Sequence, residues 1–212
     1  MKTVLAFGDS LTWGYNPETL TRHARGDRWT VALAEALGGR AEVIAEGLNG
    51  RTTAFDDHLG EADRNGARVL PTLLTSHKPL DLVIILLGTN DLKPAVHGRA
   101  IAAKQGVEKL VRIVRHHEWT LGCEMPDVLI VAPPPFCESA DPDFAAVFDR
   151  SIDESHMLGS MYADLADELE CGFFDAATVA KTSPLDGIHL DADSTKAIGK
   201  ALAPVVSLML GL

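Results

Sequence analysis

The chain has 212 residues, of which 46% are hydrophobic and 23% are charged, a composition typical of a globular protein with a sizeable core. Its 30 acidic and 19 basic side chains leave a formal net charge of −11, which argues against a general binder of the nucleic-acid phosphate backbone. The sequence holds neither an apolar run long enough to cross a membrane nor an N-terminal apolar stretch long enough for a signal peptide, so we expect a cytoplasmic protein with no nucleic-acid or membrane partner.

Short apolar runs recur along the chain and predict the strands of a sheet. The middle three runs are dense in Val, Ile and Leu with little alternation, which is typical of parallel strands that are covered on both faces. In chain order the expected strands are Thr3–Phe7, Glu42–Ala45, Leu82–Leu87, Val128–Ala132 and Phe173–Phe174.

Segments with helical spacing separate these runs. In chain order the expected helices are Arg28–Leu37, Gly66–His77, Arg99–His117, Phe144–Glu170 and Ala192–Leu210. Asp27 is a candidate N-cap of the first helix, and Gly38 and Gly39 are expected to end it. Strands that alternate with helices predict a doubly wound α/β fold. Because the sequence shows no repeat and no linker, we expect one domain over residues 1–212.

Three loops are expected to leave the carboxyl ends of strands. They are Tyr15–Gly26, Thr89–Gly98 and Pro133–Asp143. In open α/β sheets this edge holds the ligand crevice, so the loops are candidates for the walls of one pocket. Ordinary surface connections remain the alternative for each loop.

The first chemical motif is GDSLTWG at residues 8–14. Ser10 lies just beyond a predicted strand, and Gly8 allows a sharp turn that would present the serine at the sheet edge. A serine hydroxyl becomes an effective nucleophile only when a neighbouring base takes its proton. Because Gly-Asp-Ser is also a common turn sequence, the motif indicates catalysis only if a base lies elsewhere in the chain.

The sequence DGIH at residues 186–189 supplies a candidate base. A turn can bring Asp186 and His189 to one side of the backbone, where the carboxylate accepts the Nδ1–H of the imidazole and leaves Nε2 free. Without Ser10 upstream, the same pair would be interpreted as a local cap or a surface contact before the last helix.

Hydrogen-bond donors for an anionic oxygen are the third requirement of acyl transfer. Asn90, in GTND at residues 88–91, offers a neutral amide, although asparagine is also common in turns. The backbone N–H of Ser10 is a second candidate donor. Either Gly47 or Gly50, in GLNG after the second strand, is a third.

Serine, glycine, asparagine and histidine thus occur in four blocks in one order, and in this respect the chain resembles the SGNH, or GDSL, hydrolases. The blocks are GDSLTWG with Ser10, EGLNGRTT with Gly50, LLGTND with Asn90 and DGIHL with His189. The phrases GDSLTWG, RTT at residues 51–53 and LDLVIILLGTND make the chain most similar to the aryl esterase and acyltransferase branch.

The resemblance implies a flavodoxin-like three-layer α/β/α sandwich with a five-stranded parallel sheet. It implies that Ser10, Asp186 and His189 form a catalytic triad, and that the N–H groups of Ser10 and Gly50 form an oxyanion hole with the Asn90 amide. It also implies esterase chemistry without a metal or an organic cofactor. Because members of the branch are often oligomers, a homo-oligomer is expected.

The family often carries acidic and aromatic side chains near the serine. Trp13, Tyr15 and Asn49 are the candidates for substrate binding here, although core packing would explain Trp13 or Tyr15 equally well. Asp9 is expected to be a structural hydrogen-bonding acid rather than a second base.

We therefore expect a serine esterase that hydrolyses short-chain aryl or alkyl esters through an acyl-enzyme, with acyl transfer to alcohols as a second reaction. Its partner would be a small-molecule ester. A carbohydrate O-deacetylase or an acyl-thioester hydrolase would use the same residues. Outside the enzymes, an inactive α/β binding module is the alternative. A nucleotide-binding domain is disfavoured because the sequence lacks both glycine-rich phosphate motifs.

The remaining candidate ligands point to no metal site. Cys123, Cys137 and Cys171 are widely spaced and form no C-x-x-C pair, so we expect free thiols in a reducing compartment. The pair His116–His117 is expected to lie at a solvated helix end.

Overall fold

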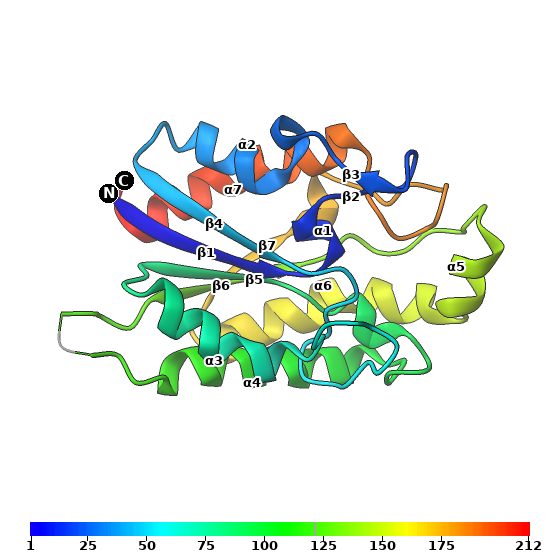
Figure 1. Ribbon diagram of the computed structural model, residues 1–212, viewed down its shortest axis with the longest axis horizontal. Coiled ribbons are helices and arrows are strands. Elements are labelled where there is room, and N and C mark those ends of the chain that lie inside the picture. The colour runs from blue at the N-terminus through cyan, green and yellow to red at the C-terminus, as the bar shows by residue number, and fades with distance from the viewer. Residues whose placement is uncertain (121) are drawn as a thin grey trace.

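A five-stranded parallel sheet forms the centre of the computed structural model, which describes residues 1–120 and 122–212 (Figure 1). Across the sheet the strands follow the order β4 (Ala41–Gly47), β1 (Lys2–Gly8), β5 (Leu82–Leu86), β6 (Asp127–Ala132) and β7 (Gly172–Asp175). Every neighbouring pair is parallel. The fold that the resemblance implied is confirmed, and β4 is longer at both ends than its apolar run indicated.

Helices cover both faces of this sheet, as Figure 1 shows. One face carries α2 (Trp29–Ala36) and α7 (Ala192–Leu210), and the other carries α3 (Gly66–His77), α4 (Ala100–His116) and α6 (Ser151–Glu168). Successive side chains of a strand point to opposite faces. Val4 and Ala6 of β1 therefore join the core under α2 and α7, whereas Leu5 and Phe7 join the other core. Burial on both faces explains why the strands read as continuous apolar runs.

The helix predicted over Phe144–Glu170 is wrong, because two helices occupy this region. They are α5 (Pro142–Val147) and α6, and Arg150 between them adopts a left-handed backbone with φ 61°. The Asp141 carboxylate accepts the N–H groups of Asp143 and Phe144 and so caps the start of α5. The hydroxyl of Ser151 donates to the Leu92 carbonyl at 2.6 Å and anchors the start of α6. The apolar periodicity runs on across the break, so the sequence did not reveal it.

The start of α2 also differs from the prediction. Arg28 is the N-cap residue and makes no side-chain cap hydrogen bond. Asp27 lies one residue earlier, in the 3-10 turn η1 (Arg25–Asp27), and its carboxylate pairs with Lys196 at 3.1 Å. The predicted end of the helix is confirmed, because Gly38 and Gly39 both have positive φ angles.

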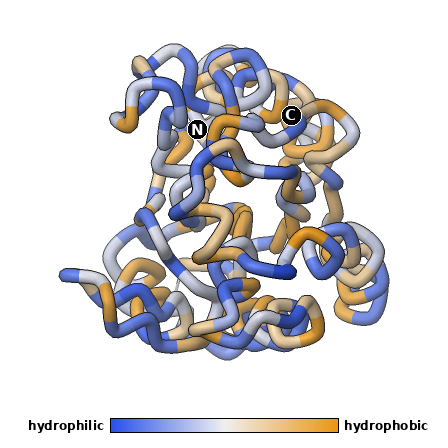
Figure 2. Tube along the Cα trace, turned by 90° about the vertical axis from the view of Figure 1, so that its right-hand side faces the viewer, coloured by the Kyte–Doolittle hydropathy of each residue, from blue (hydrophilic) through white to orange (hydrophobic). Residues whose placement is uncertain are grey.

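The carboxyl ends of the strands meet at one edge of the sheet, on the right in Figure 1 and facing the viewer in Figure 2. The short elements at or beyond this edge are α1 (Ser10–Trp13), the hairpin of β2 (Tyr15–Asn16) and β3 (Thr21–Arg22), and the 3-10 turns η2 (Asn90–Leu92) and η3 (Ala176–Thr178). The outer helices alternate between hydrophobic and hydrophilic segments in Figure 2, as expected for helices that bury one side. Among the described residues, no helix combines the length and the apolarity needed to span a membrane.

Gly199 lets α7 lie directly against α2. A Cβ atom at this position would lie 2.2 Å from the Trp29 carbonyl oxygen and 2.9 Å from the Leu33 nitrogen. Because these are backbone atoms that cannot rotate away, we expect Gly199→Ala to lower the free energy of unfolding by about 1–3 kcal/mol, even though alanine is the better helix former. Urea titration followed by circular dichroism measures the change. Lys200→Ala, at an exposed neighbouring position, is the control, and equal stability of Gly199→Ala and wild type would contradict this packing.

Candidate active site

A tight strand-to-helix turn places Ser10 at the carboxyl edge of the sheet. A Cβ atom on Gly8, the last residue of β1, would lie 2.0 Å from Thr12 Oγ1 and 2.8 Å from the Leu86 carbonyl oxygen, so only glycine fits there. Asp9 caps α1 by accepting the Leu11 N–H at 2.9 Å. Ser10 is consequently the first residue of α1, and it is buried except for 5% of its surface.

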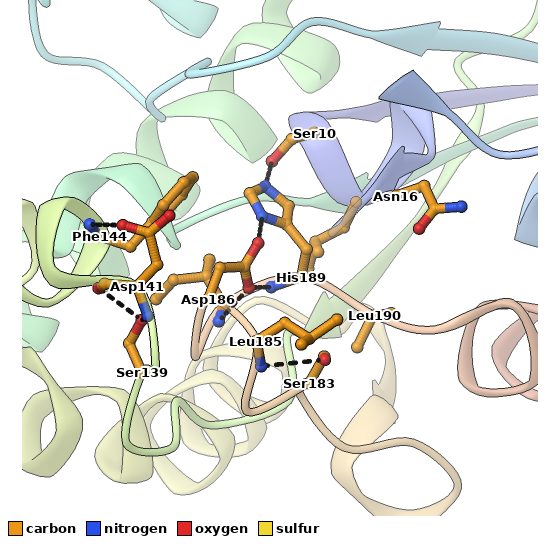
Figure 3. A network of polar contacts seen from close by, with 12 residues as sticks. Ser10, Asn16, Ser139, Asp141, Phe144, Ser183, Leu185, Asp186, His189 and Leu190 are labelled. Carbon is orange, nitrogen blue, oxygen red and sulfur yellow. Dashed lines mark hydrogen bonds and ion pairs between the residues drawn. The ribbon is translucent and has the colours of Figure 1, made fainter. Parts of the chain in front are cut away.

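The structure brings Ser10, His189 and Asp186 into one line (Figure 3). Nδ1 of His189 lies 2.6 Å from Asp186 Oδ2, and Nε2 lies 2.9 Å from Ser10 Oγ. The second oxygen of Asp186 accepts the backbone N–H groups of Ile188 and His189 at 3.0 and 2.9 Å. Burial opposes ionisation of Asp186, but the hydrogen bonds from His189 and the backbone outweigh it and lower the pKa of the carboxyl. The ionised carboxylate therefore holds the Nδ1–H tautomer and leaves Nε2 as an acceptor for the serine hydroxyl.

Backbone hydrogen bonds anchor the segment that carries His189. The Cys137 N–H donates to the Gly187 carbonyl at 3.0 Å, and the Ser183 N–H donates to the His189 carbonyl at 2.7 Å. Gly187 has φ 78°, and a Cβ atom there would lie 2.5 Å from the Cys137 carbonyl oxygen. This glycine is thus required by a close backbone approach as well as by the turn.

His23 is a residue of this site that the sequence did not indicate. Its buried ring nitrogen Nε2 lies 2.9 Å from the Leu190 carbonyl oxygen. The contact links the N-terminal loop to the residue that follows His189. Nothing in the sequence around His23 distinguishes it from a surface histidine.

Two aromatic rings flank the imidazole. The Tyr15 ring is 4.2 Å from the His189 ring between centroids, and the Phe144 ring approaches edge-on at 5.6 Å. Tyr15 therefore lies at the site, as expected. Phe144 comes from α5 and was not expected there, because it was predicted as the first residue of a long helix rather than as part of the pocket wall.

Two of the predicted oxyanion donors, Gly50 and Asn90, come from the segments that follow β4 and β5. Gly50, with φ 81°, and Asn90 both line the cavity that contains Ser10. The Asn90 amide nitrogen donates to the Arg51 carbonyl at 3.1 Å and lies 3.5 Å from Asp9 Oδ2. Gly47 lies within β4, where a Cβ atom would be 2.2 Å from the Trp13 nitrogen. The structure therefore places Gly50 at the cavity and packs Gly47 against the backbone of α1.

Arg51 ties the ends of two strands together beneath the site. Its guanidinium donates to the carbonyl oxygens of Gly8 and Glu46 and lies 4.4 Å from the Phe7 ring centroid. Burial lowers the pKa of Arg51 to about 10, so the group still carries its charge at neutral pH. In the sequence this residue stood out only as part of the phrase RTT.

Two fully buried carboxyl groups, those of Asp9 and Asp91, lie next to the predicted oxyanion donor Asn90. Burial raises the pKa of Asp9 to about 6 and that of Asp91 to about 7. Asp91 accepts the N–H of Thr53 at 3.1 Å and also its hydroxyl. Asp91 thereby joins the loop after β4 to the loop after β5. Unlike Asp9, it was not a candidate residue in the sequence.

The cavity at Ser10 has a volume of about 290 Å³. Phe144, Val147 and Phe148 form its apolar wall, and Asn49 lines it as expected. Trp13 is not among the lining residues; it stacks under the Arg22 guanidinium at 4.9 Å. The Trp13 side chain thus contacts Arg22 of the β2–β3 hairpin, and its role in substrate binding stays a prediction.

Comparison with known proteins finds solved structures that are similar over the whole chain. The crystal structure of a carbohydrate acetylesterase family member from Sinorhizobium meliloti is 59% identical, covers 100% of both chains and has a TM-score of 0.98. A second carbohydrate acetylesterase from the same organism is 40% identical and covers 99% of this chain and 100% of its own, with a TM-score of 0.93. The native M. smegmatis aryl esterase has the same identity, coverage and TM-score. The comparison with curated proteins gave no match.

The family assignment rests on a match to most of the chain. Residues 6–196 match the GDSL-like lipase/acylhydrolase family. This span includes all four blocks, from Ser10 to His189, on which the resemblance was based. The chain therefore belongs to the GDSL-like lipase/acylhydrolase family.

Proposed function

We propose that the protein hydrolyses short-chain carboxylic esters through an acyl-enzyme on Ser10. The observation that carries this proposal is the continuous line from Asp186 through His189 to Ser10, with heavy-atom distances of 2.6 and 2.9 Å, at the wall of a cavity. An imidazole held in this way is a general base for the serine hydroxyl.

In the first half of the reaction, His189 Nε2 accepts the Ser10 proton while Ser10 Oγ bonds to the ester carbonyl carbon. The carbonyl oxygen becomes anionic and is held by the N–H groups of Ser10 and Gly50 and by the Asn90 amide. When the intermediate collapses, the bond to the alcohol oxygen breaks and His189 returns its proton to that oxygen. Asp186 remains ionised throughout and stabilises the imidazolium.

In the second half, water replaces the alcohol. His189 accepts a proton from the water as its oxygen bonds to the acyl carbon, and collapse releases the carboxylic acid and restores the Ser10 hydroxyl. An alcohol that attacks instead of water would yield a transfer product. The apolar wall of Phe144, Val147 and Phe148 offers such an alcohol a binding surface.

Acetylated carbohydrates are a second candidate substrate class. The Asn49 side-chain oxygen is buried and has no hydrogen-bond partner within residues 1–120 and 122–212, and Asn49 lines the cavity. A buried acceptor without a partner is costly, and a sugar hydroxyl would supply the missing donor. The similarity to the Sinorhizobium carbohydrate acetylesterases favours the same candidate.

A substrate panel separates the two classes. Because the cavity holds about 290 Å³, we expect 4-nitrophenyl acetate and butyrate to be hydrolysed with a higher kcat/KM than the octanoate. Acetylated xylose and an acetyl thioester are measured beside them, and excess propanol tests for the transfer ester. Turnover of the acetylated sugar alone would replace the aryl ester assignment, and equal rates for acetate and octanoate would contradict the size limit.

Ser10→Ala is expected to abolish turnover, because no other hydroxyl lies against His189 Nε2 among the described hydrogen bonds. The wild-type protein should react with a fluorophosphonate probe, intact-mass spectrometry should show one label, and tandem mass spectrometry of the digested protein should locate it on Ser10. Ser183→Ala, in the same segment as His189 but bonded to it only through its backbone, is the control for folding. A labelled Ser10→Ala protein would overturn the nucleophile assignment.

Asn90→Ala is expected to lower kcat by about 10²–10³, the usual effect of removing one oxyanion donor, with a smaller change in KM. The loss falls on kcat because the amide is proposed to bind an oxygen that becomes charged only in the transition state. Steady-state kinetics on 4-nitrophenyl acetate measure both constants. An unchanged kcat would remove Asn90 from the mechanism.

A further inference from the structure

Two cationic side chains, Arg64 and Lys93, line the same cavity as Ser10 and His189. Both pair with a single oxygen of Asp57: Arg64 at 2.8 Å and Lys93 at 3.5 Å. The other oxygen of Asp57 accepts the Leu59 N–H at 3.1 Å. One nearly buried carboxylate thus faces two cations, and this Arg64–Lys93 cluster carries an excess positive charge.

The cluster adjoins two of the proposed oxyanion donors. A Cβ atom on Gly50 would lie 2.6 Å from Arg64 Nε, so the guanidinium packs directly on this glycine. Lys93 follows η2, and its backbone N–H donates to the Asn90 carbonyl at 3.3 Å. Each cation is therefore anchored next to a proposed donor, and both line the cavity that contains Ser10.

The charge of Lys93 is only partly compensated by the protein. Its side chain is 16% exposed, and its ammonium lies 5.7 Å from the Phe148 ring centroid. Burial lowers the pKa of Lys93, and the attraction of Asp57 does not fully offset it. Asp143 is a further carboxylate in the cavity wall, but it is exposed, and none of the described ion pairs joins it to Arg64 or Lys93. A second anion beside Lys93 would restore the stabilisation of the charged ammonium group that is lost when this group is desolvated.

We infer that the preferred esters of this protein carry an anionic group, such as a carboxylate, that pairs with Lys93 and Arg64 when the ester lies at Ser10. This inference rests on the proposed ester hydrolysis and adds the substrate class. The protein as a whole has a net charge of −11 and repels anions at long range. Selection of an anionic ester therefore depends on this local contact. The anionic group belongs either to the acid half or to the alcohol half of the ester.

Matched pairs of esters test the inference and distinguish the two halves. Monoethyl succinate is compared with ethyl butyrate for the acid half, and 3-acetoxybenzoate is compared with its methyl ester for the alcohol half. A pH-stat at neutral pH gives kcat/KM for each ester. For at least one pair we expect the charged member to be favoured by about tenfold, as for a charge-assisted hydrogen bond, and we expect added salt to reduce this ratio.

Two variants should move the ratio of charged to neutral substrate in opposite directions. Lys93→Met removes a cation at similar length and should lower the ratio by about tenfold. Asp57→Asn removes the competing carboxylate, keeps an oxygen for the Leu59 N–H, and should raise the ratio. Lys104→Met, which removes a lysine paired with Glu168 away from the cavity, should leave it unchanged.

The outcomes separate this inference from the function on which it rests. A wild-type ratio near one in both pairs, or a ratio that salt, Lys93→Met and Asp57→Asn leave unchanged, would overturn the inference. A wild-type protein that hydrolyses none of the four esters would instead overturn the proposed function. Because the salt series uses wild-type protein, the inference stays testable even if a variant fails to fold.

Discussion

The contact between Ser10 and His189 is the constraint on which the rest of the structure depends. The two residues are separated by 179 positions, and neither lies in a strand. Ser10 begins α1 directly after β1, and His189 lies between β7 and α7. They meet because all five strands are parallel, so that the connections from their carboxyl ends converge on one edge. A hydrogen bond of 2.9 Å between such distant residues requires the whole sheet to be in register.

Buried polar groups hold the loops and strand ends together at this edge of the sheet. Asp91 joins the loop after β4 to the loop after β5 through Thr53, and Arg51 binds carbonyl oxygens at the ends of β1 and β4. Burying charged and polar groups is unfavourable unless they have partners, and the raised pKa values of Asp9 and Asp91 reflect that cost. In return, the donors around Ser10 are held in place before a substrate arrives, which is the condition for electrostatic stabilisation of an oxyanion.

The cavity combines surfaces of different chemistry around Ser10. The α5 segment contributes the aromatic side chains Phe144 and Phe148, and the loops after β4 and β5 contribute Asn49, Arg64 and Lys93. Phe144 lies in the first turn of α5, where the Asp141 carboxylate accepts its N–H, and its ring contacts His189. Loops and one short helix therefore supply most of the cavity lining, whereas the sheet positions Ser10 and His189, a division that is common in α/β enzymes.

The sequence by itself determined the five strands through local apolar runs, and the order of its motifs made Ser10, Asp186, His189 and Asn90 the candidate site residues. An apolar run indicates a strand that is buried on both faces of the sheet, and the sequence DGIH places an acid and a histidine one turn apart. Only the tertiary structure decided the break before α6, the contact of Trp13 with Arg22, and the position of Gly50 rather than Gly47 at the cavity. It also decided the clustering of Arg64, Lys93 and Asp57. These features depend on contacts between segments far apart in the chain, and no local spacing of residue types records such contacts.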